Sequence, residues 1–327
     1  MDRETQICGL GFYVPDKILT NDDLEKLVDT SDEWITTRTG IKKRHIVEDE
    51  ACSDLALVAA QNALQDAHLE PQDLTHIITA TFTPDSYIPS AACVLQKKLG
   101  IKDIPSCDIN AACTGFIYAL DLARGFCALY ADAKVLVVAS EVVTSRVNFN
   151  DRSTCVLFGD GAGAVILSNS GEDGAVLEDV LLKADGSLGE LLTVKGGGSA
   201  YPLTFGQKAD EDFFVQMQGQ TVFKHAVRSM SNIALEILKK NNLSVEDINL
   251  LIPHQANNRI IEAVGKKLEF PPEKIFVNVQ DYGNTSAASV PIALAEAKQK
   301  GRIAPGDRVL LVAFGGGFTW GAALVKF

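Results

Sequence analysis

The stretch "ALQDAHLEPQDLTHII", from Ala63 to Ile78, decides the fold, because the chain repeats its pattern as "ILKKNNLSVEDINLLI" from Ile237 to Ile252. At an offset of 174 residues, two leucines, an aspartate and an isoleucine fall in matching places. Each copy predicts a helix, a turn and a strand. Repetition at this length is typical of two similar halves rather than of a short-period solenoid.

Two further segments support the repeat. "KVLVVAS" (134–140) lies over "RVLLVAF" (308–314) at the same offset of 174, and both are typical of buried strands. "FGDGAGAVIL" (158–167) matches "FTWGAALVKF" (318–327) at an offset of 160. The two offsets differ by 14 residues, which indicates an insertion of that length in the first half. Chance similarity between ordinary α/β segments is the alternative interpretation.

The sequence therefore predicts an α/β protein in five layers: helix, sheet, helix, sheet and helix. Its two halves are expected to be residues 1–170 and residues 171–327. No linker rich in Pro, Gly and Ser separates them, so we expect the halves to share one interface.

Composition and charge exclude several classes of protein. The chain is 46% hydrophobic and 22% charged, which is typical of a soluble globular protein. A formal net charge of -12 disfavours binding to nucleic acid or to an anionic membrane surface. We expect no secretory signal, and the longest apolar runs are too short to span a membrane. Seven cysteines without a CxxC pair indicate the reducing cytoplasm rather than a disulfide scaffold or a zinc site.

Cys113 is the first candidate for chemistry. It lies in "INAACTGFIYAL" (109–120), between a predicted strand and a predicted helix. The unpaired N–H groups and the positive dipole end of a helix N-terminus favour a thiolate, which makes Cys113 a candidate nucleophile. Small neighbouring residues leave room for a substrate. The alternative is a buried core thiol, because cysteine is among the most buried residue types.

Polar groups later in the chain are further candidates. His254 follows an apolar strand and is flanked by amides, although a structural histidine is equally compatible with this pattern. Asn284 lies in a Gly-Asn turn before a predicted helix, for which Thr285 and Ser286 are capping candidates. The glycines of "AFGGGFTWG" (313–321) would bring backbone N–H groups to an oxyanion, or form a tight hairpin.

Together these motifs resemble the thiolase superfamily. The resemblance is carried by "AACTGF" around Cys113, "PHQAN" around His254, "GNTSAAS" around Asn284 and "AFGGGFTWGAALV" near the C-terminus. "DTSDEWITTRTGIKKRHI" (29–46) and "FGDGAGA" extend it over essentially the whole chain. Within the superfamily the chain is similar to the β-ketoacyl-acyl-carrier-protein synthases III, which initiate fatty acid synthesis. The resemblance implies a thiolase-like five-layered αβαβα fold of two pseudo-repeated halves, in agreement with the repeat.

The resemblance also implies a decarboxylative Claisen condensation. Cys113 would attack the thioester of a short acyl-CoA, with acetyl-CoA the expected primer. His254 and Asn284 would donate hydrogen bonds to the thioester carbonyl of malonyl-acyl-carrier-protein while carbon dioxide leaves. Asparagine at 284 favours the initiating class, because elongating relatives carry a second histidine there. Backbone N–H groups of Cys113 and Gly316 would form the oxyanion hole, and Phe314 would exclude water. No metal or bound cofactor is expected.

The family's CoA site maps onto five residues. Trp34 and Arg152 would stack on opposite faces of the adenine, and Arg152 lies in the predicted insertion. Thr30, Arg38 and Asn257 are further CoA contacts carried over by position. A hydrophobic anchor is the alternative role of Trp34.

Docking of an acidic acyl carrier protein would need a basic patch, because the chain itself is acidic. The residues expected to form it are Lys224, Arg259, Lys266 and Lys267, and a solvated helix face is the alternative. The resemblance further implies a homodimer in which Ile88 shapes the acyl pocket of the other subunit. This chain departs from the family here, because the well-known enzyme has a phenylalanine at this position, and a smaller, branched side chain would change the accepted acyl length.

Three other functions stay open from the sequence. A condensing enzyme of secondary metabolism would use the same three catalytic residues with another starter or acceptor. A Cys-His-Asn thioesterase would need water at the acyl-enzyme, which the apolar "FGGGF" disfavours. A catalytically silent carrier-binding subunit would be expected to lack one of the three side chains, and all three are present.

Overall fold

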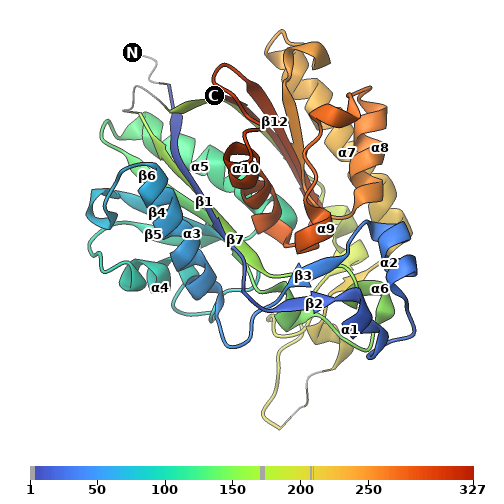
Figure 1. Ribbon diagram of the computed structural model, residues 1–327. Helices are drawn as coiled ribbons and strands as arrows, with labels where there is room; N and C mark the ends of the chain where they lie inside the picture. Colours follow the sequence, from blue (N-terminus) through green and yellow to red (C-terminus); the bar gives the residue numbers. More distant parts are fainter. Residues whose placement is uncertain (1–3, 170–173, 207, 209) are drawn as a thin grey trace.

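The computed structural model describes residues 4–169, 174–206, 208 and 210–327. Its main element is a nine-stranded sheet in the order β11-β12-β13-β8-β1-β7-β6-β4-β5 (Figure 1). These strands are β1 (Gln6–Tyr13), β4 (His76–Ala80), β5 (Ser106–Ile109), β6 (Lys134–Glu141), β7 (Gly161–Ser168), β8 (Ala175–Ala184), β11 (Leu250–Pro253), β12 (Arg308–Gly315) and β13 (Thr319–Lys326).

The strand order repeats between the two halves. In the first half β5, β4 and β6 run parallel, β7 is antiparallel to β6, and β1 follows β7. In the second half β11 and β12 run parallel, β13 is antiparallel to β12, and β8 follows β13. An isolated parallel bridge between Leu251 and Ile275 takes the place of β5. The repeat of 174 residues is therefore a repeat of chain path, as the sequence predicts.

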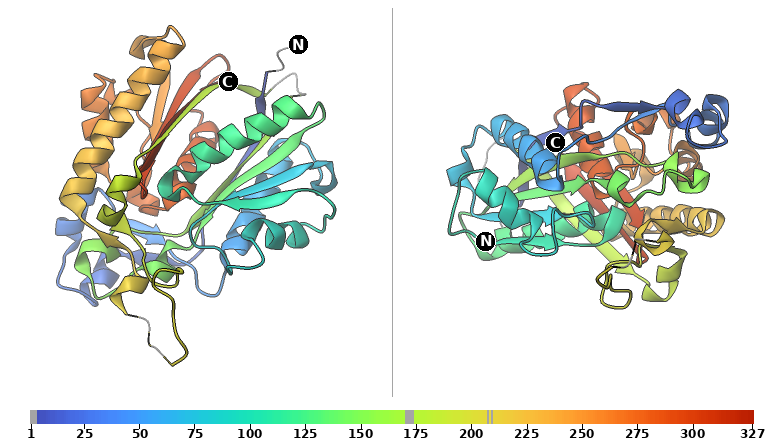
Figure 2. Two further views of the ribbon diagram at one scale, coloured as in Figure 1. Left: turned by 180° about the vertical axis from the view of Figure 1, so that it is seen from behind. Right: turned by 90° about the horizontal axis from the view of Figure 1, so that it is seen from below.

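The two halves of the sheet join at β1 and β8. Within the described residues these strands pair at Gln6 with Val176 and at Ile7 with Ala175. Elsewhere the halves diverge and enclose α5 (Gly115–Leu129) and α10 (Ser289–Gln299), as Figures 1 and 2 show. The sequence predicts two separate sheets, whereas these hydrogen bonds make them continuous. The predicted boundary between residues 170 and 171 lies outside the described residues.

Helices cover the two outer faces of the sheet. On the first half lie α3 (Cys52–Asp66) and α4 (Ala91–Lys98), and on the second lie α7 (Gly219–Lys240) and α8 (Asn258–Lys267) (Figure 2). Buried apolar side chains fill the space on both faces of each half. The arrangement is helix, sheet, helix, sheet, helix, which confirms the predicted five-layered αβαβα fold.

The short elements β2 (Ile18–Thr20), β3 (Lys43–His45), α1 (Asn21–Glu25), α2 (Asp32–Thr39) and α6 (Arg152–Cys155) gather at one end of the layered body (Figure 1). The other short elements are β9 (Leu192–Thr193), β10 (Gln216–Met217) and α9 (Val279–Tyr282). Residues 142–160 connect β6 to β7 and contain α6, whereas residues 316–318 suffice between β12 and β13. The predicted insertion is thus this connection.

Short 3-10 helices complete the chain. Two of them begin the central helices: η2 (Ala112–Thr114) precedes α5, and η8 (Ser286–Ala288) precedes α10. The others are η1 (Pro71–Asp73), η3 (Val143–Arg146), η4 (Gly186–Leu191), η5 (Glu211–Phe213), η6 (Val245–Asp247) and η7 (Pro272–Lys274).

One helical stretch, Ala112–Leu129, is long and apolar enough to cross a membrane by length and composition alone. Half of it is buried inside the protein. Phe116, Ile117 and Leu120 of this stretch are completely buried in the central layer. Packing between the two halves of the sheet therefore explains its apolar character.

We predict that Phe116→Ala lowers the free energy of unfolding by about 3–5 kcal/mol, because it leaves a cavity in the central layer. Leu129→Ala on the same helix is the control, since Leu129 is 77% exposed and its truncation should cost less than about 0.5 kcal/mol. Chemical unfolding of both variants measures the difference. Equal effects would contradict the placement of α5 between the two halves of the sheet.

Candidate active site

A cavity of about 1470 Å³ is lined by residues from both halves of the chain. Its lining includes all five residues predicted for chemistry: Cys113, His254, Asn284, Phe314 and Gly316. Phe314 and Gly316 lie at the end of β12 and in the turn that follows it. The glycine run therefore forms the hairpin between β12 and β13 and also lines the cavity. The hairpin and a position beside the candidate site, which the sequence offered as alternatives, are compatible.

Cys113 lies in η2, directly before α5. The end of β12 packs against it so closely that a Cβ on Gly315 would lie 2.7 Å from the Cys113 nitrogen and 3.0 Å from the Cys113 Cβ. Only glycine fits at this contact without displacing the nucleophile.

The predicted thiolate does not agree with the structure. Burial raises the pKa of Cys113 to about 11, and the nearby carboxyl group of Glu141 adds to the increase. A hydrogen bond from Ser286 lowers the pKa but does not overcome desolvation. The helix terminus lies where predicted, but in the free protein the thiol keeps its proton at neutral pH.

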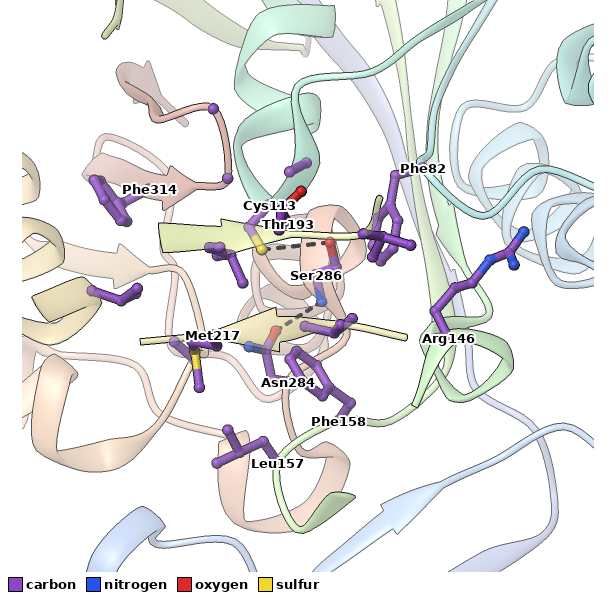
Figure 3. Close-up of a pocket in the computed structure, with 18 of the residues that line it drawn as sticks. Phe82, Cys113, Arg146, Leu157, Phe158, Thr193, Met217, Asn284, Ser286 and Phe314 are labelled. Carbon is purple, nitrogen blue, oxygen red and sulfur yellow. Dashed lines mark hydrogen bonds between the residues drawn. The ribbon is translucent and has the colours of Figure 1, made fainter. Parts of the chain in front are cut away.

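Ser286 connects the nucleophile to Asn284 (Figure 3). Its hydroxyl lies 3.5 Å from the Cys113 sulfur, and its backbone N–H donates to Asn284 Oδ1 at 2.9 Å. Because that bond occupies the carbonyl of the amide, the other group of Asn284 is the Nδ2 donor. Thr285 occupies the N-cap position of η8, as predicted, but its side chain makes no capping bond. Ser286 is the first residue of η8 and caps neither η8 nor α10.

His254 lies directly after β11, as predicted, and is buried. Its Nδ1 is 2.6 Å from the hydroxyl of Ser289, which also accepts a bond from Gln255 N–H at 3.4 Å. We assign the Ser289 proton to the bond with Nδ1, which places the imidazole proton on Nε2. Burial lowers the pKa of His254 to about 4. His254 is thus a neutral hydrogen-bond donor at neutral pH.

The residues expected to bind CoA are only partly assembled at the cavity. Arg38 and Asn257 line it, whereas Thr30, Trp34 and Arg152 lie outside its lining. The Arg152 guanidinium is 4.8 Å from the centre of the Trp34 ring. An adenine between them would need about 7 Å, which is two stacking distances. Trp34 and Arg152 are adjacent as predicted, but they contact each other directly.

The predicted basic patch divides into two pairs. Lys224 and Arg259 line the cavity, from the second turn of α7 and the first turn of α8. Lys266 and Lys267 lie at the other end of α8 and are exposed outside the cavity lining. Ile88 is also outside the lining and is 87% exposed.

The sequence did not predict Glu141 or Ser289 as residues of the site, and it predicted Ser286 only as a helix cap. Glu141 is the charged last residue of the apolar strand "KVLVVASE" and is completely buried. A charge at the end of a buried strand was the available signal. Ser286 and Ser289 lie in "GNTSAAS", and nothing in the sequence shows what their hydroxyls contact. Within the described ranges, no group of three or more His, Cys, Asp or Glu side chains has a geometry suited to a metal.

Known proteins share both the sequence and the fold. The family model for 3-oxoacyl-[acyl-carrier-protein] synthase III matches residues 107–186, and the model for the C-terminal part of that enzyme matches residues 238–327. A protein from Oleidesulfovibrio alaskensis named β-ketoacyl-[acyl-carrier-protein] synthase III is 56% identical over 329 residues, covering 100% of both chains. The chain belongs to the 3-oxoacyl-acyl-carrier-protein synthase III family. It is an acyltransferase, as predicted.

Solved structures of synthases III confirm the fold class. The enzyme from Aquifex aeolicus superposes with a TM-score of 0.90 at 49% identity, covering 99% of this chain and 100% of that one. The enzyme from Pseudomonas aeruginosa gives a TM-score of 0.90 at 37% identity, covering 99% and 98%. Neither the secondary-metabolite alternative nor the thioesterase alternative is favoured by these relatives.

We predict opposite effects for two glycine substitutions. Gly315→Ala places a Cβ against the backbone of Cys113, and this overpacking should lower the free energy of unfolding by about 1–3 kcal/mol. Gly125→Ala lies within α5, where an added Cβ meets nothing within 4 Å, and it should raise stability by up to about 1 kcal/mol. Chemical unfolding compares them. A Gly315→Ala protein as stable as the Gly125→Ala protein would disprove the tight contact at Cys113.

Proposed function

We propose that this synthase III condenses a short acyl-CoA, with acetyl-CoA as primer, with malonyl-acyl-carrier-protein. The products are a 3-oxoacyl-acyl-carrier-protein, CoA and carbon dioxide. The observation that carries the proposal is the convergence of one thiol and two neutral hydrogen-bond donors, Cys113, His254 and Asn284, on one cavity.

In the first half-reaction Cys113 attacks the acyl-CoA thioester. Its sulfur forms a bond to the acyl carbon, and the bond from that carbon to the CoA sulfur breaks. Backbone N–H groups of Cys113 and Gly316 stabilise the oxyanion that forms in between. The position of Gly316 supports this role, because a Cβ there would lie 3.6 Å from the Cβ of Ala112, next to the nucleophile.

In the second half-reaction the malonyl group loses carbon dioxide. The thioester oxygen becomes an enolate oxygen, and His254 Nε2–H and Asn284 Nδ2–H donate to it. Both side chains are buried, so these hydrogen bonds act with little screening by water. The enolate carbon then attacks the acyl carbon on Cys113, the bond from that carbon to the Cys113 sulfur breaks, and the released thiolate takes up a proton from water. Phe314, buried and packed 4.7 Å from the Phe318 ring centre, keeps water from the acyl-enzyme.

Binding of CoA requires Arg152 to move off Trp34, so that the adenine enters between the indole and the guanidinium. Arg152 also donates to the backbone oxygen of Asp29 at 2.7 Å. This hydrogen bond restricts the position of the Arg152 guanidinium while it lies against the Trp34 ring. The buried hydroxyl of Thr30 has no hydrogen-bond partner in the described part of the chain, and CoA would supply one. Arg38 and Asn257 complete the site.

Carrier-protein docking uses Lys224 and Arg259 at the cavity, with Lys266 and Lys267 extending the positive surface along α8. The enzyme acts in the cytoplasm as a homodimer, without a resident cofactor or metal. Ile88 reaches the acyl pocket of the other subunit. The exposure of Ile88 and of its neighbour Tyr87, 87% and 76%, supports the dimer, since a second subunit would cover these apolar side chains.

We predict that His254→Ala and Asn284→Ala separate the two half-reactions. Each variant should form the acyl-Cys113 adduct but lose condensation by about 10²–10³-fold, because one enolate donor is missing. Intact-protein mass spectrometry follows the adduct, and chromatography follows the 3-oxoacyl product. His225→Ala is the matched control, since His225 lies 5.6 Å from the Phe318 ring and outside the cavity lining. Condensation at the normal rate in either donor variant would overturn the proposed mechanism.

We also predict that Lys224→Glu raises the KM for the acidic carrier-protein substrate about tenfold at low salt, through lost steering. The effect should shrink as salt is added, because exposed charges are screened. Lys102→Glu makes the same change of charge on the exposed loop before β5 and should leave the KM unchanged. Steady-state kinetics at several salt concentrations measure the KM of both variants for the carrier-protein substrate. Equal effects of the two substitutions would point to the net charge of the protein rather than to docking at α7.

A further inference from the structure

Glu141 is a carboxyl group that the proposed mechanism does not yet use. It is completely buried at the end of β6. Among the described residues, no Lys, Arg or His forms an ion pair with it. A buried carboxylate without a cation has to be stabilised by hydrogen bonds alone.

Four donors surround this carboxyl group. Thr81 Oγ1, the Phe82 backbone N–H and Thr83 Oγ1 donate to Oε2 at 3.0, 3.2 and 2.6 Å. The other oxygen, Oε1, accepts from Ser286 Oγ at 3.1 Å. One oxygen is thus held by the first half of the chain, and the other faces the second half.

Ser286 links Glu141 to the nucleophile. Its oxygen lies 3.5 Å from the Cys113 sulfur (Figure 3), and its backbone has a left-handed φ of 52°. Such a conformation is unfavourable for serine and persists only where surrounding contacts enforce it. The Ser286 hydroxyl is within donor distance of both the Cys113 sulfur and Glu141 Oε1. It has one proton and donates to one of them at a time, so when it donates to Glu141 its oxygen is left to accept from the Cys113 thiol. In that arrangement the three groups form a chain from S–H to O–H to carboxylate.

We propose that Glu141, acting through Ser286, accepts the proton of Cys113 when the thiol attacks. The inference rests on the proposed function. As the sulfur–carbon bond forms, the thiol proton passes to Ser286 Oγ and the Ser286 proton passes to Glu141. When the bond to the CoA sulfur breaks, Glu141 returns its proton to Ser286 Oγ, and the Ser286 proton passes to the departing CoA thiolate, which leaves as the thiol. Glu141 is then a carboxylate again, and no other reactant is needed.

The ionisation of the neighbouring groups supports this route. Burial raises the pKa of Cys113 to about 11, so the thiol keeps its proton at neutral pH and attack requires a proton acceptor. His254, with a pKa of about 4, is a weak acceptor. Burial raises the pKa of Glu141 to about 7, which suits proton exchange at neutral pH.

Cys52 of α3 is a further ionisable group close to Glu141. Burial raises the pKa of Cys52 to about 12, and the charges of Glu141 and Asp85 add to the increase, so this thiol stays uncharged near neutral pH. The neighbouring β7, whose Gly161 pairs with Glu141, carries no ionisable side chain from Gly161 to Ser168.

Alkylation of Cys113 by iodoacetamide from about pH 5 to about pH 9 tests the chain without an acyl primer. In the wild-type protein the rate should rise with pH through about 7, as Glu141 becomes a carboxylate. Glu141→Gln keeps the shape of the side chain but should remove this inflection and lower the rate at neutral pH by about 10²-fold. Peptide mass spectrometry assigns the site, with the exposed Cys93 and Cys107 as internal references.

Two variants separate proton transfer from a structural role. Ser286→Ala breaks the link but leaves the three donors to Oε2, and it should lose the same inflection. The double variant, Glu141→Gln with Ser286→Ala, should be alkylated at Cys113 no more slowly than either single variant, because each substitution interrupts the same proton path. Asp160→Asn is the matched control: Asp160 is also completely buried and accepts from Val47 N–H, Thr144 N–H and Thr144 Oγ1. It should keep the wild-type profile.

An inflection near pH 7 that survives in Glu141→Gln, or an equal loss in Asp160→Asn, overturns the inference. Acylation by acetyl-CoA is measured separately on the wild-type protein. Failure of that reaction would count against the proposed function, whereas an unchanged alkylation profile in Glu141→Gln would count only against Glu141.

Discussion

The hydrogen bonds of Ser286 hold the active site together across the two halves of the chain. From the second half, this residue contacts Cys113 and Glu141 of the first half and orients Asn284 of its own half. The layered fold makes the contact possible, because α5 and α10 lie side by side between the two parts of the sheet and begin at the same place. A change in how the halves pack would therefore disturb the positions of Cys113 and Asn284 together.

Burial decides the charge state of the site. It raises the pKa of Cys113, lowers that of His254 and raises that of Glu141. At rest the site holds a neutral thiol and a neutral imidazole, which suits the binding of an uncharged thioester. In the proposed mechanism, charge develops only on oxygens that face hydrogen-bond donors, and burial of His254 and Asn284 strengthens those hydrogen bonds.

The sequence predicted those features that leave a periodic or chemical pattern. The repeat of 174 residues predicted the five layers. The motifs around Cys113, His254 and Asn284 predicted that three segments distant in the sequence form one site, and all three residues line one cavity. The sequence did not predict features that depend on which of two opposing interactions is stronger, or on which side chains are in contact in the folded protein. The helix dipole at Cys113 competes with desolvation, and only the packing of Gly315 and its neighbours shows that desolvation prevails. The direct contact of Trp34 with Arg152 and the bonds of Glu141 likewise depend on coordinates.

Mass spectrometry of the wild-type protein tests the central claim most directly. The protein is incubated with acetyl-CoA, the adduct is assigned by peptide mapping, and malonyl-acyl-carrier-protein is then added. We expect an acetyl group on Cys113 that disappears as acetoacetyl-acyl-carrier-protein forms. An adduct that is discharged only to free acetate, or the absence of an adduct on Cys113, would contradict the account.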